Sequence, residues 1–269
     1  MFTDSHCHLT FPELTRDWPQ IDTAMREAGV TRALCICTTC EEFEQVHALA
    51  MRDARLCATV GVHPDSEGVR EPDQALLEHW AARPRVVGIG ETGLDYYRLN
   101  GRSWDDMAWQ RERFRVHIRA ARATGLPLVV HTRSAAEDTL QILREEGEDG
   151  SAGSAGGVFH CFTETQAVAR AALDMGFYIS FSGIVTFRNA EDLRAVARFV
   201  PDDRMLIETD SPYLAPVPYR GKTNSPAFVP YVAAELARVR GATPQTIGML
   251  TTQNYLRLFS RVVQTEAAA

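Results

Sequence analysis

Short apolar runs alternate along the chain with longer amphipathic segments. The runs predict eight strands, at residues 2–8, 31–38, 56–62, 85–91, 126–131, 157–161, 177–182 and 203–209. Strands that alternate with helices in this way form a parallel sheet, because each parallel crossover needs a helix-sized connection. Eight such units followed by further helices favour an α/β fold of the (β/α)8 or TIM-barrel type, in one domain spanning residues 1–269. No Gly-x-Gly-x-x-Gly follows the first strand, so an open dinucleotide-binding sheet is not favoured.

Start and stop signals delimit two of the connecting helices. Ser103 and Asp106 form a capping-box-like start, and Gly125 supplies the stop. Asn189 opens another helix, which Pro201 ends. Both segments carry apolar residues at helical spacing, so we expect each helix to pack one face against the sheet.

The last third of the chain is also predicted to be structured. Ser225–Pro226 and Thr243–Pro244 each combine an N-cap residue with proline at the first helical position, which predicts two helices after the last strand. Residues 147–157 are rich in glycine and serine, but they lie between a predicted helix and a predicted strand. A flexible surface loop is therefore expected there, and not a domain boundary. The tail at about 264–269 is expected to be disordered.

Composition narrows the class of protein. A chain of 269 residues with 45% hydrophobic residues can bury a large core. No basic segment with a following apolar stretch opens the sequence and no run of 18 apolar residues occurs, so we expect a cytoplasmic protein without membrane contact. The net charge of −7 argues against a protein that coats long duplexes. It leaves room for an enzyme that binds a few phosphates through metal ions and local arginines.

The cysteines are predicted to be reduced and buried. Most of them lie in apolar stretches, and a chain of this size does not depend on a disulfide framework. Cys37 and Cys40 have zinc-ligand spacing, but no second pair completes a tetrahedral site. A structural zinc is therefore disfavoured. The six cysteines are Cys7, Cys35, Cys37, Cys40, Cys57 and Cys161.

Metal-binding side chains gather where the predicted strands end, which is where the active sites of this barrel type lie. His6 and His8 are two residues apart on a strand, so their side chains share a face. Each such residue has a structural explanation when taken alone, as a satisfied histidine, a cap or a turn residue. Their joint occurrence favours a shared metal centre, whereas His47, His79 and His117 lie on predicted helices. The strand-end residues are His6, His8, His63, Glu91, His131, His160, Glu208 and Asp210.

Four imidazoles and two carboxylates exceed the ligand set of one catalytic zinc. They suit two divalent ions bridged by a carboxylate, and Glu91, midway around the barrel, is the predicted bridge. We expect one ion on His6, His8, Glu91 and Asp210, and the other on Glu91, His131 and His160.

Such a centre predicts hydrolysis by a metal-activated water. Asp210 is the first candidate to orient that water or move its proton, and Glu208, two residues earlier, is the second. Arg133 and His63 are candidate substrate-binding residues, with a purely structural role left open for both. Lys222, the only lysine, lies after the last strand and is a third candidate for binding an anionic group.

Seven stretches, taken in order, indicate a family. They are Asp4-Ser-His-Cys-His8, Gly61-Val-His-Pro64, Gly88-Ile-Gly-Glu-Thr-Gly-Leu-Asp95, Val130-His-Thr-Arg133, His160-Cys-Phe162, Ser180-Phe-Ser-Gly183 and Glu208-Thr-Asp-Ser-Pro-Tyr213. They span the whole chain, and they resemble the TatD-type metal-dependent hydrolases of the amidohydrolase superfamily.

The resemblance implies a barrel deoxyribonuclease with two divalent ions, Mg2+, Zn2+ or Mn2+, which acts as a 3'–5' exonuclease on single-stranded DNA or another nucleic-acid end. Where the family often has a second histidine after the His-Pro pair, this chain has Asp65, so no substrate contact is carried over to that position. The family's metal ligands carry over to the six positions already chosen from the strand ends: His6, His8, Glu91, His131, His160 and Asp210.

Two other functions remain open. Some TatD-like proteins remove D-amino acids from tRNA, so the alternative is a metal-dependent deacylase or amidohydrolase acting on an ester or amide. A non-enzymatic metal-binding barrel would require six ligands with no open coordination position. No obligate protein partner is expected.

Overall fold

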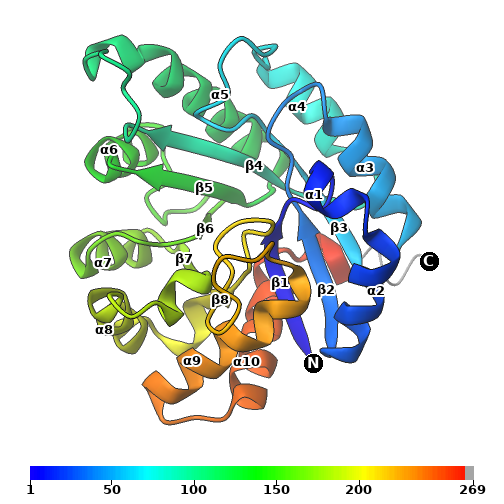
Figure 1. Cartoon of the computed structure of the whole chain (residues 1–269). Helices are drawn as coiled ribbons and strands as arrows, with labels where there is room; N and C mark the ends of the chain where they lie inside the picture. Colours follow the sequence, from blue (N-terminus) through cyan, green and yellow to red (C-terminus); the bar gives the residue numbers. More distant parts are fainter. Residues whose placement is uncertain (264–269) are drawn as a thin grey trace.

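The computed structural model describes residues 1–263 and contains eight parallel strands that pair in chain order (Figure 1). A bridge between Cys7 and Ser211 brings the chain after the last strand back against the first strand. The sheet therefore curls into a (β/α)8 barrel, and the predicted fold class is confirmed. The strands are β1 (Phe2–Cys7), β2 (Val30–Cys35), β3 (Leu56–Val60), β4 (Val86–Asp95), β5 (Leu128–Arg133), β6 (Gly157–Phe159), β7 (Tyr178–Phe181) and β8 (Met205–Ile207).

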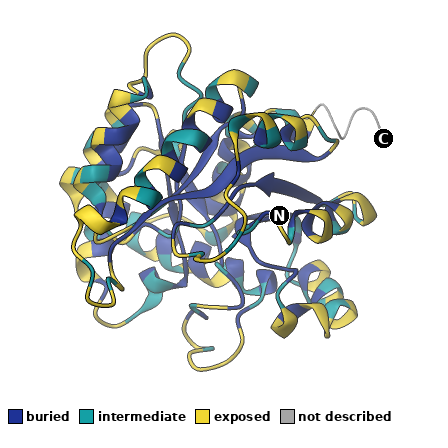
Figure 2. Ribbon diagram, turned by 90° about the horizontal axis from the view of Figure 1, so that it is seen from above, coloured by how far each residue is buried: buried dark blue, intermediate teal, exposed yellow. Residues whose placement is uncertain are grey.

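Helices surround this sheet, with their buried faces toward the strands and their exposed faces toward solvent (Figure 2). The α-helices are α1 (Pro12–Thr15), α2 (Trp18–Glu27), α3 (Phe43–Arg52), α4 (Gln74–Ala81), α5 (Ala108–Thr124), α6 (Ala136–Glu145), α7 (Gln166–Asp174), α8 (Glu191–Phe199), α9 (Val229–Arg240) and α10 (Pro244–Leu258). Short 3-10 turns are η1 (Asp105–Met107), η2 (Gly183–Thr186), η3 (Asp202–Arg204) and η4 (Pro226–Phe228).

The barrel interior is closed at one end by the C-terminal helix. Tyr255 of α10 and Phe259, the residue that ends it, pack in one cluster with interior side chains of seven strands, among them Val129 and Val158. Side chains two residues apart on a strand share a face, so the residues that follow these two in the interior are His131 and His160. The apolar plug at one end thus leaves the polar strand ends to form the other end.

The predicted capping box at Ser103 is present, but α5 itself begins five residues later, at Ala108, with Met107 as its N-cap residue. Ser103 N donates to Asp106 Oδ2 at 2.8 Å and Asp106 N donates to Ser103 Oγ at 3.4 Å, which is the reciprocal bonding of a capping box. The turn η1 follows and leads into α5. Gly125 ends α5 in the left-handed conformation with a φ of 66°.

The predicted start of α8 at Asn189 is wrong. The helix begins at Glu191 and its N-cap residue is Ala190. The Arg194 side chain explains the shift. Its guanidinium donates to the carbonyls of Val185 and Phe187, and these bonds keep the segment before Ala190 in a separate turn outside the helix. The predicted end is confirmed, since the helix stops one residue before Val200 and Pro201 follows.

The two predicted helices after the last strand are present. Thr243 accepts a hydrogen bond from Thr246 N and begins α10, with proline at the first position. Ser225 caps η4, which continues directly into α9. The helix predicted from Ser225 therefore starts as a 3-10 turn.

The glycine-rich stretch at 147–157 is a loop between α6 and β6, as predicted. Glu148 within it is fully buried and accepts hydrogen bonds from the backbone of Ala155 and Gly156, which joins the two ends of the loop just before β6. The predicted disordered tail at 264–269 lies outside the described residues.

The six cysteines are free, five of them buried and Cys161 partly exposed, which confirms the prediction of reduced thiols. Among the described residues, no helix is long and apolar enough to cross a membrane.

Candidate metal centre

A cavity of about 770 Å³ opens at the C-terminal ends of the strands. Five of the six predicted metal ligands line it, and His6, which is fully buried, lies next to them in contact with His8 and Glu91. The prediction that these strand ends share one site is therefore supported by their positions. The five ligands that line the cavity are His8, Glu91, His131, His160 and Asp210.

Glu91 lies between two pairs of histidines. Its Oε2 is 3.2 Å from His6 Nε2 and 3.8 Å from His8 Nε2. Its Oε1 is 2.8 Å from His160 Nε2 and 3.2 Å from His131 Nδ1. Each carboxylate oxygen therefore faces a different histidine pair, as a carboxylate that bridges two ions would.

Glycines on both sides of Glu91 allow this placement. Gly90 and Gly93 have φ values of 144° and 135°, a backbone conformation that residues with a side chain rarely adopt. A Cβ atom on Gly90 would also lie 2.6 Å from the carbonyl oxygen of Val129, and one on Gly93 would lie 2.0 Å from that of His131. The end of β4 thus approaches β5 closely only because these residues have no side chain.

His6 and His8 form one half of the centre together with Asp210. Their Nε2 atoms are 3.2 Å apart, and Asp210 Oδ1 is 3.6 Å from the first and 3.3 Å from the second. Asp210 N donates to the carbonyl of His6, which fixes the end of β8 against β1. Asp4 adds to this link, because its carboxylate accepts hydrogen bonds from the backbone and hydroxyl of Thr209.

His131 and His160 form the other half, and each has a second carboxylate at the ring nitrogen that does not face Glu91. His131 Nε2 is 3.0 Å from Asp95 Oδ2, and His160 Nδ1 is 3.2 Å from Glu208 Oε1. These contacts leave His131 Nδ1 and His160 Nε2, 3.4 Å apart, facing the cavity. An acid behind a ligand histidine fixes the orientation and tautomer of the ring.

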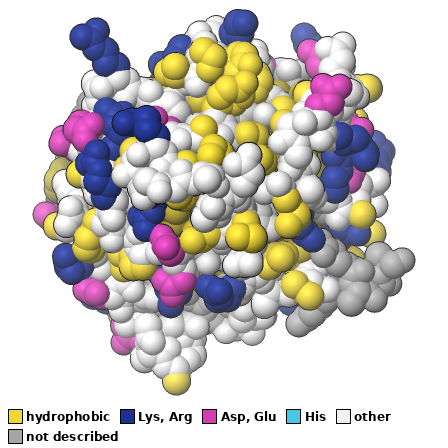
Figure 3. Space-filling view, turned by 90° about the horizontal axis from the view of Figure 1, so that it is seen from below, with side chains coloured by type: hydrophobic (Ala, Val, Ile, Leu, Met, Phe, Trp, Pro, Cys, Tyr) yellow, Lys and Arg dark blue, Asp and Glu magenta, His cyan; other side chains and the backbone are white. Residues whose placement is uncertain are grey.

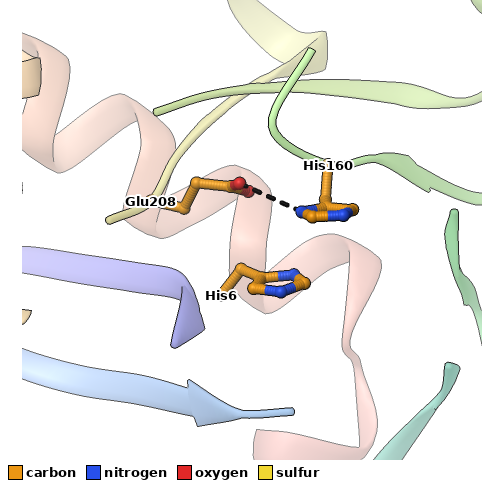
Figure 4. A group of neighbouring side chains, drawn as sticks. All are labelled: His6, His160 and Glu208. Atoms are coloured by element: carbon orange, nitrogen blue, oxygen red, sulfur yellow. Dashed lines mark hydrogen bonds and ion pairs between the residues drawn. The ribbon is translucent and has the colours of Figure 1, made fainter. Parts of the chain in front are cut away.

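Figure 4 shows the arrangement around His160. The Glu208 carboxylate faces its Nδ1, and the His6 ring lies parallel to it at 3.9 Å between centroids and 9° between planes. Glu208 Oε1 also accepts from the backbone N–H of Cys161 at 2.7 Å. Glu208 is fully buried and does not line the cavity.

The charges of the site favour a cation. Burial alone would raise the pKa of Glu91, but the neighbouring His160, His63 and His6 hold it well below its usual value. Burial lowers the pKa of His160 less than Glu91 and Glu208 raise it, so that pKa lies well above its usual value. Ionised carboxylates that attract protons onto buried imidazoles would equally attract a metal ion. Imidazole nitrogens with carboxylate oxygens are a donor set that Zn2+ and related divalent ions accept.

The family model described as TatD related DNase matches residues 3–260. The chain belongs to the TatD family. It is 45% identical over 260 residues to the uncharacterized metal-dependent hydrolase YcfH of Escherichia coli K12, covering 95% of this chain and 94% of YcfH. It is 33% identical over 263 residues to the 3'-5' ssDNA/RNA exonuclease TatD of Cronobacter sakazakii, covering 95% of this chain and 97% of that protein.

A solved structure supports the same assignment. The TatD homologue YJJV of Escherichia coli K12 superimposes with a TM-score of 0.85 at 25% identity, covering 96% of this chain and 98% of that one. The TatD resemblance seen in the motifs is thus confirmed. So is the coarser functional conclusion, that this is a metal-dependent hydrolase of the TatD family.

Of the three predicted substrate-binding residues of this TatD chain, two line the cavity and one does not. His63 Nδ1 accepts a hydrogen bond from Asp65 N at 3.0 Å, so the proton of the neutral ring is on Nε2, which points at Glu91 Oε1 at 3.3 Å. Arg133 lines the cavity. Lys222 does not line it, because its ammonium lies on the outer loop, 5.7 Å from the Tyr219 ring centroid.

The helical histidines are not part of the centre. His47 Nε2 contacts the carbonyl of Pro84, and His117 is fully buried between two backbone groups. Asp95, which holds His131, was not among the predicted site residues. It belongs to β4, whose predicted end at residue 91 falls four residues short.

Proposed function

We propose that this chain is a deoxyribonuclease that hydrolyses phosphodiester bonds at the ends of single-stranded DNA with two divalent ions. The observation that carries the proposal is the position of Glu91, whose two oxygens face separate histidine pairs. When bound, ions in such a pair lower the pKa of a water and offset charge on a phosphoryl oxygen. The holding residues would be His6, His8, Glu91 and Asp210 for one ion, and Glu91, His131 and His160 for the other.

We assign to Asp210 the role of accepting the proton of the attacking water. Its carboxylate lines the cavity beside His8. Burial raises the pKa of Asp210, but the hydrogen bond with His8 and the charges of the nearby histidines together lower it below its usual value. An ionised carboxylate at this position is able to orient a water and accept its proton. The left-handed φ of 55° at Asp210 turns the chain sharply at the end of β8 and brings the side chain to the cavity.

Glu208 has a positioning role in this proposal. It was the second candidate for moving the proton, but it is fully buried behind His160 and away from the cavity. A carboxylate there cannot meet the substrate, whereas it can keep His160 Nε2 directed at the centre.

His63 and Arg133 are assigned to the substrate. The His63 imidazole lies at the wall of the cavity beside Glu91, and the Arg133 guanidinium is a cation at its mouth. An imidazole and a guanidinium are both suited to hydrogen-bond the non-bridging oxygens of a phosphodiester. Lys222 lies outside the cavity, so we assign it no contact.

The surface charge favours strand ends over duplexes. The net charge is −7, and Figure 3 shows basic and acidic side chains interspersed on the face that it presents. Binding along a duplex requires a continuous series of cations against the phosphates. An unpaired end needs only a pocket, and this one holds about 770 Å³.

The relative of Cronobacter sakazakii supports a nucleic-acid substrate, because its name describes a 3'-5' ssDNA/RNA exonuclease. The experiment is turnover by metal-reconstituted protein on linear single-stranded DNA, on a closed circle of the same sequence and on an aminoacyl ester. We expect cleavage of the linear strand only. Equal rates on the circle would exclude a requirement for an end, and turnover of the ester without DNA cleavage would replace the nuclease by a deacylase.

A further inference from the structure

We propose that the cavity mouth carries two nucleobase-stacking sites on opposite sides of the metal centre, one at Tyr213 with Phe11 and the other at Tyr97 with Arg133. The inference rests on the proposed nuclease function and names residues that select the substrate. It starts from two tyrosines that are more than half exposed, Tyr97 at 58% and Tyr213 at 53%. Tyr213 lines the cavity, and Tyr97 lies against Arg133, which also lines it. Exposed tyrosines in these positions suggest a partner that covers them.

The first site lies beside β1 and β8. Tyr213 and Phe11 both line the cavity, with ring centroids 6.2 Å apart and planes at 74°. Phe11 in turn lies over His8 at 4.7 Å between centroids. The three rings therefore form a continuous path from solvent to a residue of the metal centre.

The second site lies beside β4 and β5. The Arg133 guanidinium lies over the Tyr97 ring at 3.6 Å from its centroid, and Arg133 also lines the cavity. Arg98 lines the cavity next to this pair. A cation over an aromatic ring offers a flat surface for a base and a charge for the adjoining phosphate.

The strand order puts the two sites opposite each other. The strands pair in the order β1 to β8 and the ring closes between β8 and β1, so β4 and β5 lie across the barrel from β8 and β1. Glu91 lies between the two sides. A phosphodiester bound at the proposed metal centre around Glu91 therefore has one neighbouring nucleotide directed at each aromatic site.

Both tyrosines have a fixed backbone and a ring that is more than half exposed. Tyr213 N donates to the carbonyl of Asp210, and Asn224 Nδ2 donates to the carbonyl of Tyr213. Tyr97 N donates to Asp95 Oδ1, the carboxylate that also holds His131. A ring on an ordered backbone loses little entropy when a base stacks on it, so the sites are preorganised.

The experiment compares linear oligonucleotides that carry a base at each of the last two positions with oligonucleotides that are abasic at one of them. For the wild-type protein we expect each abasic change to raise KM about tenfold with kcat nearly unchanged, because a stacked base contributes that much binding. Tyr213→Ala should lose the discrimination at one position and Tyr97→Ala at the other. Tyr213→Phe and Tyr97→Phe should retain it, because the ring remains.

Met249→Ala is the matched control, since Met249 is 54% exposed on α10 at the opposite end of the barrel and should leave the discrimination unchanged. Equal KM values for base-bearing and abasic ends in the wild type, or full discrimination in both alanine variants, would overturn the stacking sites while the nuclease activity stands. Absence of any DNA cleavage would overturn the proposed function, and the stacking sites with it.

Discussion

Asp95 Oδ2 lies 3.0 Å from His131 Nε2, whereas the other ring nitrogen, Nδ1, lies 3.2 Å from Glu91 Oε1. Asp95 is itself fixed, because its N–H donates to Gln110 Oε1 and its Oδ1 accepts from Tyr97 N. The aspartate thus sets which nitrogen of His131 faces Glu91. It also joins the metal centre to the backbone that carries the exposed tyrosine.

We expect Asp95→Ala to weaken metal binding at the His131 and His160 side by about tenfold to a hundredfold, the usual cost of losing an acid behind a ligand histidine. Asp95→Asn should cost less, because the amide oxygen still accepts a hydrogen bond. Calorimetric titration of metal-free protein measures both affinities. Asp192→Asn, an exposed aspartate on α8, is the control. Wild-type affinity in Asp95→Ala would contradict the assignment.

Glu91→Ala and Arg133→Ala should separate metal binding from substrate binding. Glu91 serves both histidine pairs, so its loss should remove both ions and the activity. Arg133 contacts no metal-binding residue through a hydrogen bond or ion pair in the described part of the chain. Its alanine variant should therefore keep the wild-type metal content and raise KM. Metal content and steady-state rates measured on each variant decide the matter, and two ions per chain at wild-type rate in Glu91→Ala would exclude the bridge.

The strand ends were predictable because the barrel imposes a simple rule. Period-two alternation and apolar runs locate the strands, and the fold brings their C-terminal ends together, so His131 and His160 could be placed in one site without coordinates. The same rule selected His6 and His8. The rule locates the C-terminal edge of the sheet, and these four side chains lie at that edge.

Other features depend on contacts that no periodicity encodes. The predicted fourth strand ended at Glu91, yet β4 continues through Gly93 to Asp95, because glycine at this position permits the close approach to β5. Asp95 was missed for this reason. Asn189 failed as a cap because the Arg194 guanidinium, within the helix itself, holds the preceding carbonyls. The two proposed stacking sites, Tyr213 with Phe11 and Tyr97 with Arg133, combine residues at or after the ends of different strands. These residues become neighbours only in the folded barrel.

Assembly of the centre should need no bicarbonate. A lysine can bridge two ions only after it is carbamylated, whereas a carboxylate is already anionic near neutral pH. Glu91 occupies the bridging position, and Lys222, the only lysine, is exposed and outside the cavity. Metal-free protein reconstituted in carbon-dioxide-depleted buffer should regain its full metal content and activity, and Lys222→Ala should do so too. Recovery that depends on bicarbonate and disappears in Lys222→Ala would sink the glutamate bridge.

His117 should make the fold sensitive to acid. Its Nε2 accepts from Val62 N at 3.0 Å, beside His63, and its Nδ1 donates to the carbonyl of Arg113 at 2.7 Å. Complete burial lowers the pKa of His117 to about 4, against about 6.5 in the unfolded chain. The unfolded state therefore binds more protons between these values, and stability present above pH 6.5 is lost as the pH falls toward 4. The loss is about 3 kcal/mol for this one group.

The glutamine variant isolates that contribution from the other titrating groups. His117→Gln cannot be protonated, so its free energy of unfolding should fall less steeply between pH 6.5 and 4 than that of the wild type, although it should be lower at pH 7.5 because one of the two backbone contacts is lost. Urea unfolding across this range measures both slopes. His79→Gln, at an exposed position on α4, should keep the wild-type slope. Parallel curves for wild type and His117→Gln would mean that the buried imidazole is not what makes the fold sensitive to acid.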